Sequence, residues 1–283
     1  MGEEAVIVIE NRTSRDQTLV FHGWVAAIAC LVIVLIGCDT GNEKLGSGPT
    51  RSPVLKAKIE VTDPKPNFII IYADDLGYGD VGCFGSQAIK TPHIDRLAGG
   101  GMRFTDYYAC SPVCAPSRAG LLTGRYPFRS GVIGNPYPKN EPLKRKLARK
   151  VGWILRGLGG LDLREQTVAP GISSQELTLA EALQQAGYKT GMVGKWHLGD
   201  YSRQPEFNPL RHGFDSYLGV PHSNDMIPCP LYRNEAELEP DIGTNQARLT
   251  GMYTEAALRF IQANKDNPFF LYFAHTFPHQ PLY

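Results

Sequence analysis

The stretch Cys110-Ser-Pro-Val-Cys114-Ala-Pro-Ser-Arg118-Ala-Gly-Leu-Leu-Thr-Gly124 decides how the rest of the chain is interpreted. Its second half predicts the start of a helix, because Pro116 suits a first helical position and Gly124 suits the stop. Cys114 would then lie at or just before the helix N-terminus, where unpaired N–H groups and the helix dipole favour an anion. Arg118 follows four residues later on the same face. A thiol, a cation and a helix N-terminus together indicate an anion site with a reactive centre.

An isolated cysteine here would be interpreted as a buried loop residue, since free cysteine is among the most buried residue types. The whole run, however, resembles the sulfatase signature Cys-x-Pro-Ser-Arg-x-x-x-Leu-Thr-Gly, matched by Cys114, Pro116, Ser117, Arg118, Leu122, Thr123 and Gly124. The resemblance implies that a separate maturation enzyme oxidises Cys114 to Cα-formylglycine. The hydrated aldehyde would attack sulfur, and its second hydroxyl would help to expel sulfate.

Composition sets the class of protein. The 283 residues are 42% hydrophobic and 20% charged, which suits a globular chain large enough for one sizeable α/β domain. A net charge of +1 gives no global attraction to nucleic acid, so no nucleic-acid partner is expected. The six cysteines show no CxxC pair and no disulfide-scaffold density.

The N-terminal residues indicate export. Residues 24–36 are apolar over a length that suits a signal peptide better than a membrane span. They end in Leu35-Ile36-Gly37-Cys38, which resembles a bacterial lipoprotein box. We therefore expect a signal peptide over residues 1–37 and a lipid anchor on Cys38, with an exported, periplasmic or cell-surface protein. The acidic leader, which a signal peptide does not favour, leaves a buried core segment as the alternative.

A flexible tether is expected over residues 38–66, and the catalytic domain over 67–283. Residues 68–72 form an apolar run that predicts a strand buried on both faces and ending in Asp74-Asp75. Ligands in open α/β sheets sit at such strand ends. Paired aspartates can simply cap a turn, but they also suit a hard cation. The run 67–80 resembles the first sulfatase strand, which implies that Asp74 and Asp75, with the modified Cys114, bind Ca²⁺.

The next segments predict a helix from Thr91 to the glycines at 99–101, and a second strand over 103–109. Residues 139–160 are basic, with apolar residues at helical spacing. We expect this insertion to be a surface helix packed on the domain by its apolar stripe. Contact with a membrane surface or a polyanion is the alternative.

Lys195 and His197 follow a predicted strand that begins at Lys189, after a helix with a capping box at Thr178. In extended geometry the two side chains would point the same way, although they could be a simple surface pair. Gly-Lys-Trp-His-Leu-Gly resembles the second sulfatase signature, which implies that Lys195 and His197 bind sulfate and set the protonation of the diol.

Two further elements complete the candidate site. The run 212–225 resembles the arylsulfatase A-like branch, which implies that Ser223 touches the catalytic centre. An amphipathic helix around 253–261 and a buried strand over 269–274 precede His275 and His279. In sulfatases a His-x-Pro element contacts sulfate or protonates the leaving group, which points to His279, with His275 as the competitor.

The alternation of strands and helices predicts an α/β domain with a mostly parallel central sheet flanked by helices, and the resemblance implies the alkaline phosphatase-like fold. The implied enzyme is a sulfuric ester hydrolase of the arylsulfatase type that acts on a sulfated small molecule or carbohydrate. A phosphoester or phosphonate hydrolase of the same superfamily, and an inactive sulfate-binding lipoprotein, are the alternatives.

The sequence ends a few residues after His279, at Tyr283. The family's Asp-Asn-Gly element, which supplies further calcium ligands, does not follow. We therefore expect the fold to be incomplete at its C-terminus and this chain to be inactive alone.

Overall fold

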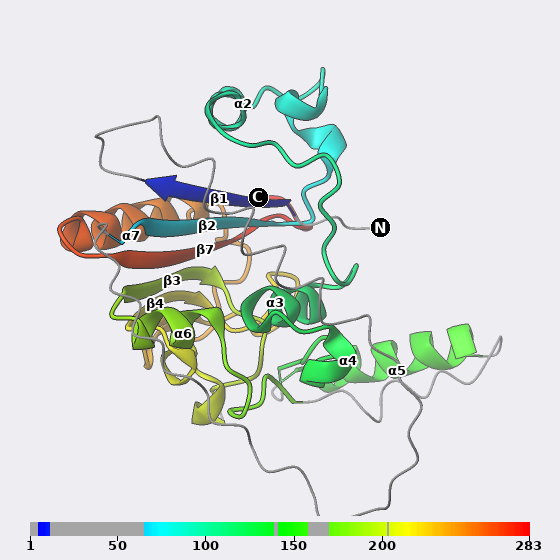
Figure 1. Cartoon of the computed structure of the whole chain (residues 1–283). Helices are drawn as coiled ribbons and strands as arrows, with labels where there is room; N and C mark the ends of the chain where they lie inside the picture. Colours follow the sequence, from blue (N-terminus) through cyan, green and yellow to red (C-terminus); the bar gives the residue numbers. More distant parts are fainter. Residues whose placement is uncertain (1–4, 12–64, 139–140, 158–169, 203) are drawn as a thin grey trace, which may run out of the picture. The chain divides into compact units, whose positions relative to one another are not determined.

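The structure is a computed structural model that describes residues 5–11, 65–138, 141–157, 170–202 and 204–283. Its centre is a seven-stranded sheet with the strand order β1-β2-β7-β3-β4-β5-β6 (Figure 1). The strands are β1 (Ala5–Asn11), β2 (Asn67–Asp74), β3 (Lys189–Lys195), β4 (Ser216–Val220), β5 (Leu231–Arg233), β6 (Ala236–Glu239) and β7 (Phe269–Pro278). The helices are α2 (Pro92–Gly100), α3 (Cys114–Thr123), α4 (Pro127–Ser130), α5 (Leu143–Gly157), α6 (Leu179–Gln185) and α7 (Leu249–Asn264).

The middle of the sheet is parallel. β7 pairs in parallel with β2 and with β3, and β3 pairs in parallel with β4. β5 and β6 continue the sheet in antiparallel pairs beyond β4. The expected α/β architecture is therefore confirmed, with an antiparallel extension on one side. Since parallel strands end at the same edge, residues that follow β2, β3 and β7 are brought together.

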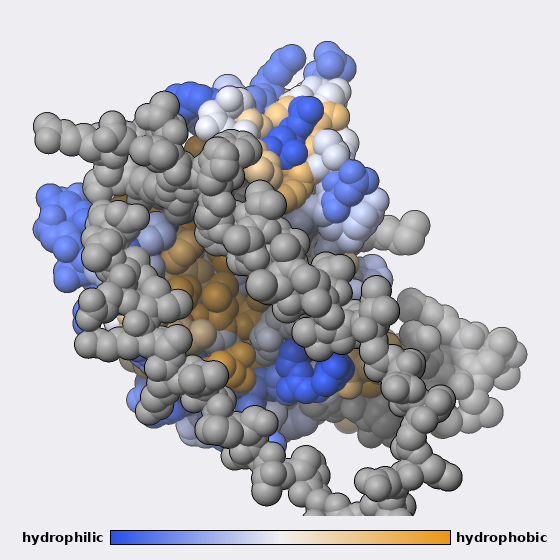
Figure 2. All heavy atoms as spheres, viewed as in Figure 1, coloured by the Kyte–Doolittle hydropathy of each residue, from blue (hydrophilic) through white to orange (hydrophobic). Residues whose placement is uncertain are grey.

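Helices cover both faces of the parallel strands, so these strands are apolar on both sides. On one face, Ala119 and Leu122 of α3 and Ala180 of α6 pack with Tyr72 and Tyr272 of the sheet. On the other face, α7 contributes Leu249, Tyr253 and Ala257, which pack with Val193 and Leu271. Figure 2 shows apolar side chains gathered in the middle of the visible face, with hydrophilic ones around them.

Close strand packing at the end of β3 requires glycine. Gly194 has φ 111°, and a Cβ on it would lie 1.9 Å from the carbonyl oxygen of Ala274 in β7. Any side chain would have to separate the two strands. Gly194 therefore allows Lys195, the next residue, to end β3 beside β7.

Most predicted elements are confirmed. The strand predicted over 68–72 is β2, which begins one residue earlier at Asn67. The strands predicted from Lys189 and Phe269 begin there, and the capping box at Thr178 opens α6. The amphipathic helix is α7, which is longer than the predicted pattern.

The strand predicted over 103–109 is wrong, because this segment is irregular. Its polar groups are engaged outside any sheet: the Arg103 guanidinium donates to the Cys83 carbonyl, and Thr105 Oγ1 lies 2.9 Å from Asp106 Oδ2. Phe104 and Tyr108 are exposed. A segment rich in aromatic residues does not form a ladder where it has no neighbouring strand to pair with.

Apart from residues 5–11, which form β1, the residues of the expected signal peptide lie outside the described part of the chain, as do Cys38 and nearly all of the tether. Within the described part of the chain, no helix is long and apolar enough to cross a membrane.

Candidate active site

Cys114 is the first residue of α3 and is buried. The prediction that it lies at the helix N-terminus is confirmed, but the helix begins earlier than expected, so Pro116 is its third residue. The next backbone N–H, that of Ala115, donates to Asn135 Oδ1 at 3.0 Å. Gly124 ends the helix with φ 64°, as predicted. The helix start is thereby fixed with Cys114 inside the protein.

A buried ionic cluster lies at the carboxyl ends of β2 and β3. Asp74, Arg118 and Lys195 all have 0% exposed side chains. Lys195 Nζ bonds to Asp74 Oδ2, and Arg118 Nη2 lies 3.5 Å from Asp74 Oδ1. Arg118 also donates from Nη1 to the Lys195 carbonyl at 2.7 Å, and its guanidinium lies 5.2 Å from the centre of the Tyr72 ring. The cluster therefore joins β2, α3 and β3.

The charge of this cluster favours an anion. Burial raises the pKa of Asp74, but the charges of Lys195 and Arg118 outweigh burial, so the pKa lies below its usual value. Asp74 is consequently ionised, and two buried cations surround one buried carboxylate. Buried charge needs compensation. An anion with several oxygens, placed beside Arg118 and Lys195, would balance the remaining positive charge.

His279 joins the site, and His275 does not. Ligand atoms of Asp74, Cys114 and His279 all lie within 4.8 Å of one another. His279 Nε2 also lies 3.7 Å from Asp75 Oδ2. The His275 ring instead packs against aromatic side chains, and its Nδ1 accepts a hydrogen bond from Phe277 N at 3.0 Å. The structure therefore selects His279 of the two predicted candidates.

His197 is fully buried, and the expectation that it continues the strand beside Lys195 is wrong. β3 ends at Lys195, and His197 has φ 58°, a left-handed conformation that is uncommon outside glycine. Burial first, and then the charge of Lys195, lowers the pKa of His197 well below its usual value. The ring is therefore neutral, and neither nitrogen makes a hydrogen bond of ordinary geometry to a described residue. The backbone of Pro136 acts weakly in the opposite direction on its pKa.

Ser223 lies beside Lys195 in the buried ionic cluster, at the position that the resemblance implied. Its Oγ accepts a hydrogen bond from Lys195 Nζ at 3.0 Å, and the side chain is buried. Sequence reasoning missed its neighbour His222, whose ring centroid is 6.3 Å from that of His197 and whose Nε2 is 3.7 Å from Asp200 Oδ1. It also missed Asn135. The position of His222 next to Ser223 was an available signal, whereas nothing local indicated Asn135.

The carboxylates at the end of β2 fit a hard cation in part. Asp74 Oδ1 is buried and accepts no hydrogen bond from a described residue, although Arg118 Nη2 lies 3.5 Å away, so it could also act as a metal ligand. Asp75 follows with φ 64° and a side chain that is 41% exposed. A thiol at Cys114 is a soft ligand that Ca²⁺ does not favour. A hydroxyl at that place would supply an oxygen instead. The donor set therefore suits calcium once Cys114 is modified.

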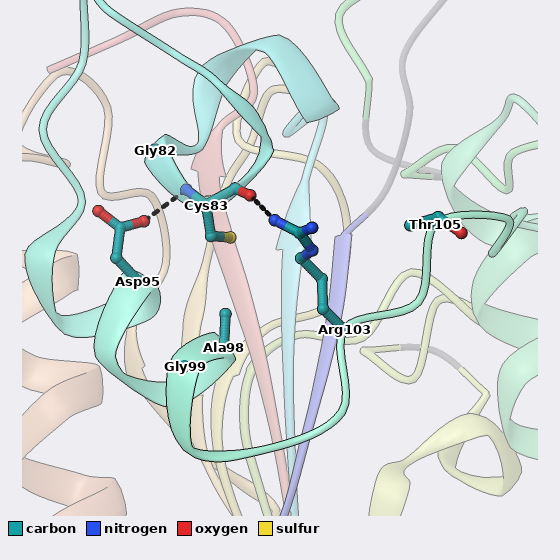
Figure 3. Close-up of a pocket in the computed structure, with 7 residues that line it drawn as sticks. All are labelled: Gly82, Cys83, Asp95, Ala98, Gly99, Arg103 and Thr105. Atoms are coloured by element: carbon teal, nitrogen blue, oxygen red, sulfur yellow. Dashed lines mark hydrogen bonds between the residues drawn. The ribbon is translucent and has the colours of Figure 1, made fainter.

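A separate pocket lies outside this cluster (Figure 3). It is bounded by the turn at Gly82 and Cys83, by α2 and by Arg103 and Thr105. Asp95 accepts from Cys83 N at 2.7 Å, so its carboxylate is engaged in holding the turn. The pocket contains none of the predicted catalytic residues, and it plays no part in the candidate site.

The mostly parallel sheet with helices on both faces is that of the alkaline phosphatase-like class. A helix N-terminus and two buried cations lie around one carboxylate at its strand ends. The sulfatase family model matches residues 66–283, and the chain belongs to the sulfatase family. N-acetylgalactosamine-6-sulfatase of Canis lupus familiaris is 37% identical over 234 residues, which are 77% of this chain and 40% of that protein. The chain thus spans about two fifths of the length of this relative.

Two solved structures show the same fold. Ps i-CgsB in complex with k-i-k-neocarrahexaose has a TM-score of 0.59 and 32% identity, over 77% of this chain and 46% of that one. BT4656 in complex with its substrate, D-glucosamine-2-N,6-O-disulfate, has a TM-score of 0.53 and 25% identity, over 76% and 35% of the two chains.

Proposed function

We propose that the protein hydrolyses a sulfate monoester to an alcohol and sulfate. The observation that carries the proposal is the buried pair Arg118 and Lys195 beside Asp74, at the helix N-terminus that begins with Cys114. Two fixed cations in a site closed to water stabilise charge on transferring oxygens far better than exposed cations do. Lys195 and Arg118 would hold the sulfate oxygens, and Ser223 would keep Lys195 aligned.

Cys114 is proposed to be oxidised to formylglycine by a separate maturation enzyme. The diol of the hydrated aldehyde would attack sulfur, and release of sulfate would regenerate the aldehyde through the second hydroxyl. His197 is neutral, and its ring nitrogens would form hydrogen bonds to the sulfate and the diol and so help to set the protonation of the diol. Asp74 and Asp75 would hold Ca²⁺, which would supply further positive charge for the sulfate oxygens.

His279 is proposed to serve the leaving oxygen. Its Nδ1 lies 2.5 Å from the carbonyl oxygen of Gln280, which can only accept, so Nδ1 carries the proton of that bond. Nε2 faces Asp75 and the Cys114 side of the site. Nε2 is therefore placed to contact the departing alcohol oxygen, where a general acid would act.

The substrate class that the relatives support is a sulfated carbohydrate. The relative from dog is named for a sulfated amino sugar, and the BT4656 complex contains one as its substrate. Export and a lipid anchor on Cys38 remain proposals that rest on the apolar run 24–36 and the lipoprotein-like box.

Paired substrates test the reaction. The protein is expressed from its natural gene together with a formylglycine-generating enzyme, and turnover of 4-nitrophenyl sulfate and 4-nitrophenyl phosphate is compared with calcium present. We expect a preference for the sulfate. Cys114→Ala should reduce turnover to background, whereas Cys110→Ala, a matched removal of an exposed thiol, should retain it. Faster hydrolysis of the phosphate, or unchanged turnover in Cys114→Ala, would contradict the proposal.

A further inference from the structure

The helix α5 (Leu143–Gly157) is the most strongly charged element in the chain. Its sequence contains six basic residues and no acidic residue, in a chain whose net charge is only +1. The basic residues are Lys144, Arg145, Lys146, Arg149, Lys150 and Arg156. Lys144 and Lys150 are exposed. A local field of this size attracts anionic surfaces even though the whole protein is nearly neutral.

The described side chains of the apolar stripe of α5 are not packed on the domain, so the expectation of a buried stripe is wrong for this part of the helix. Leu143 is 78% exposed, Leu147 60% and Val151 45%. The three residues follow one another at intervals of four, so they share one face of the helix. One contact between α5 and the rest of the protein is a hydrogen bond: Arg145 Nη1 donates to the Asp225 carbonyl at 2.8 Å. The helix therefore presents an apolar face without a described partner and a basic face.

We propose that α5 binds the surface of an anionic lipid membrane. An amphipathic helix with a basic polar face lies in the membrane interface, with its apolar side chains among the upper acyl carbons. Lys144 and Lys150 would contact lipid phosphates, while Leu143, Leu147 and Val151 would enter the interface. The helix would thereby hold the catalytic domain at the membrane, independently of any covalent lipid.

The exposed apolar face distinguishes a membrane from the other candidates. A soluble sulfated polysaccharide would satisfy the cations but would leave Leu143 and Leu147 in water. A second copy of the chain could cover the apolar face, but it would bring two sets of six cations together. Only a surface that has anionic groups and apolar chains within a few ångströms of each other can bind the basic face and the apolar face of α5 at the same time.

Vesicle binding tests the proposal with the 283-residue chain. Co-sedimentation is measured with vesicles of phosphatidylcholine alone and with vesicles containing phosphatidylglycerol, and the measured quantity is the ratio of the two affinities. Residues 24–36 contain no charged residue, and residues 1–22 are slightly acidic. Vesicle binding through this part of the chain would therefore not favour the anionic vesicles, so the ratio reports on α5.

Three variants separate the two faces. Lys144→Gln/Arg149→Gln/Lys150→Gln should lower the ratio roughly ten- to a hundredfold at low salt, because each cation near an anionic surface contributes to binding. Leu147→Gln/Val151→Gln should also weaken binding to anionic vesicles. The control Lys90→Gln/Lys189→Gln/Lys265→Gln removes as much charge from exposed positions elsewhere and should leave the ratio unchanged.

The proposal is overturned if the α5 charge variant and the control give the same ratio. It is equally overturned if Leu147→Gln/Val151→Gln binds anionic vesicles as tightly as the unaltered chain does. If that second result holds, binding to a soluble sulfated polysaccharide is measured as well. Loss of this binding in the α5 charge variant alone would show that the helix binds a polyanion instead. Circular dichroism of the variants on vesicles checks that α5 remains helical.

Discussion

Two histidines near the end of the chain show how the surroundings of a residue determine its role. His275 and His279 both follow the buried part of β7, but one ring packs among aromatic side chains and the other lies near Asp74 and Cys114. Burial lowers the pKa of His275, which suits a neutral packing residue. His279 is 17% exposed, and its Nε2 lies 3.7 Å from Asp75 Oδ2, so a substrate can reach it.

The two histidines therefore give a matched pair of substitutions. His279→Gln in the enzyme from the natural gene should lower kcat about a hundredfold or more, the range expected for loss of a general acid, with little change in Tm. His275→Gln should lower Tm and retain most of kcat. Turnover of 4-nitrophenyl sulfate and thermal melting are measured for both. A larger kcat loss in His275→Gln would show that the roles are reversed.

At the scale of elements, apolar runs and caps predicted most of the fold. Residues 68–72 and 269–274 are continuous apolar runs, and both are central parallel strands. The capping box at Thr178 is formed in full: Thr178 Oγ1 accepts from Glu181 N at 3.1 Å, and Glu181 accepts from Thr178 N at 2.8 Å. Such signals are local in sequence, and hence they can be read without a structure.

Elements that depend on distant partners were not predictable in this way. Residues 103–109 suggested a strand, but no neighbouring strand pairs with them in the described sheet. The stripe of α5 suggested packing, but whether a surface is available to receive it depends on the whole fold. In the site, Cys114 followed from a motif at a helix start, and Asp74 and Lys195 followed from runs at strand ends. His222 and Asn135 contribute through contacts between segments that periodicity does not report.

At the scale of the whole molecule, buried histidines make stability depend on pH. Burial lowers the pKa of His197, His212 and His275 in the folded protein. The unfolded chain therefore binds more protons than the folded chain below about pH 6.5, the usual pKa of histidine. Their contribution is fully present above that pH and is lost as the pH falls. Asp74, whose pKa is also lowered, acts in the same direction only below about pH 4.

We expect the free energy of unfolding to decrease between pH 6.5 and 5. Each histidine that stays neutral in the folded state contributes up to about 1.4 kcal/mol per pH unit. His212 stacks beside Trp196 with ring centroids 5.6 Å apart, so His212→Phe keeps an aromatic ring there without a titrating group. Urea unfolding at several pH values should give a shallower slope for His212→Phe. Equal slopes in the two proteins would contradict this account.

The central claim is that Cys114, at the start of α3, becomes the nucleophile through oxidation to formylglycine. Trypsin cleavage after Arg103 and Arg118 gives a peptide, residues 104–118, that contains both Cys110 and Cys114. The chain is co-expressed with a formylglycine-generating enzyme, its thiols are alkylated, and this peptide is sequenced by mass spectrometry. The account predicts an alkyl group on Cys110 and, at position 114, the lighter aldehyde residue without one. Alkylation of both cysteines, with the maturation enzyme proven active on another sulfatase in the same cells, would contradict the claim.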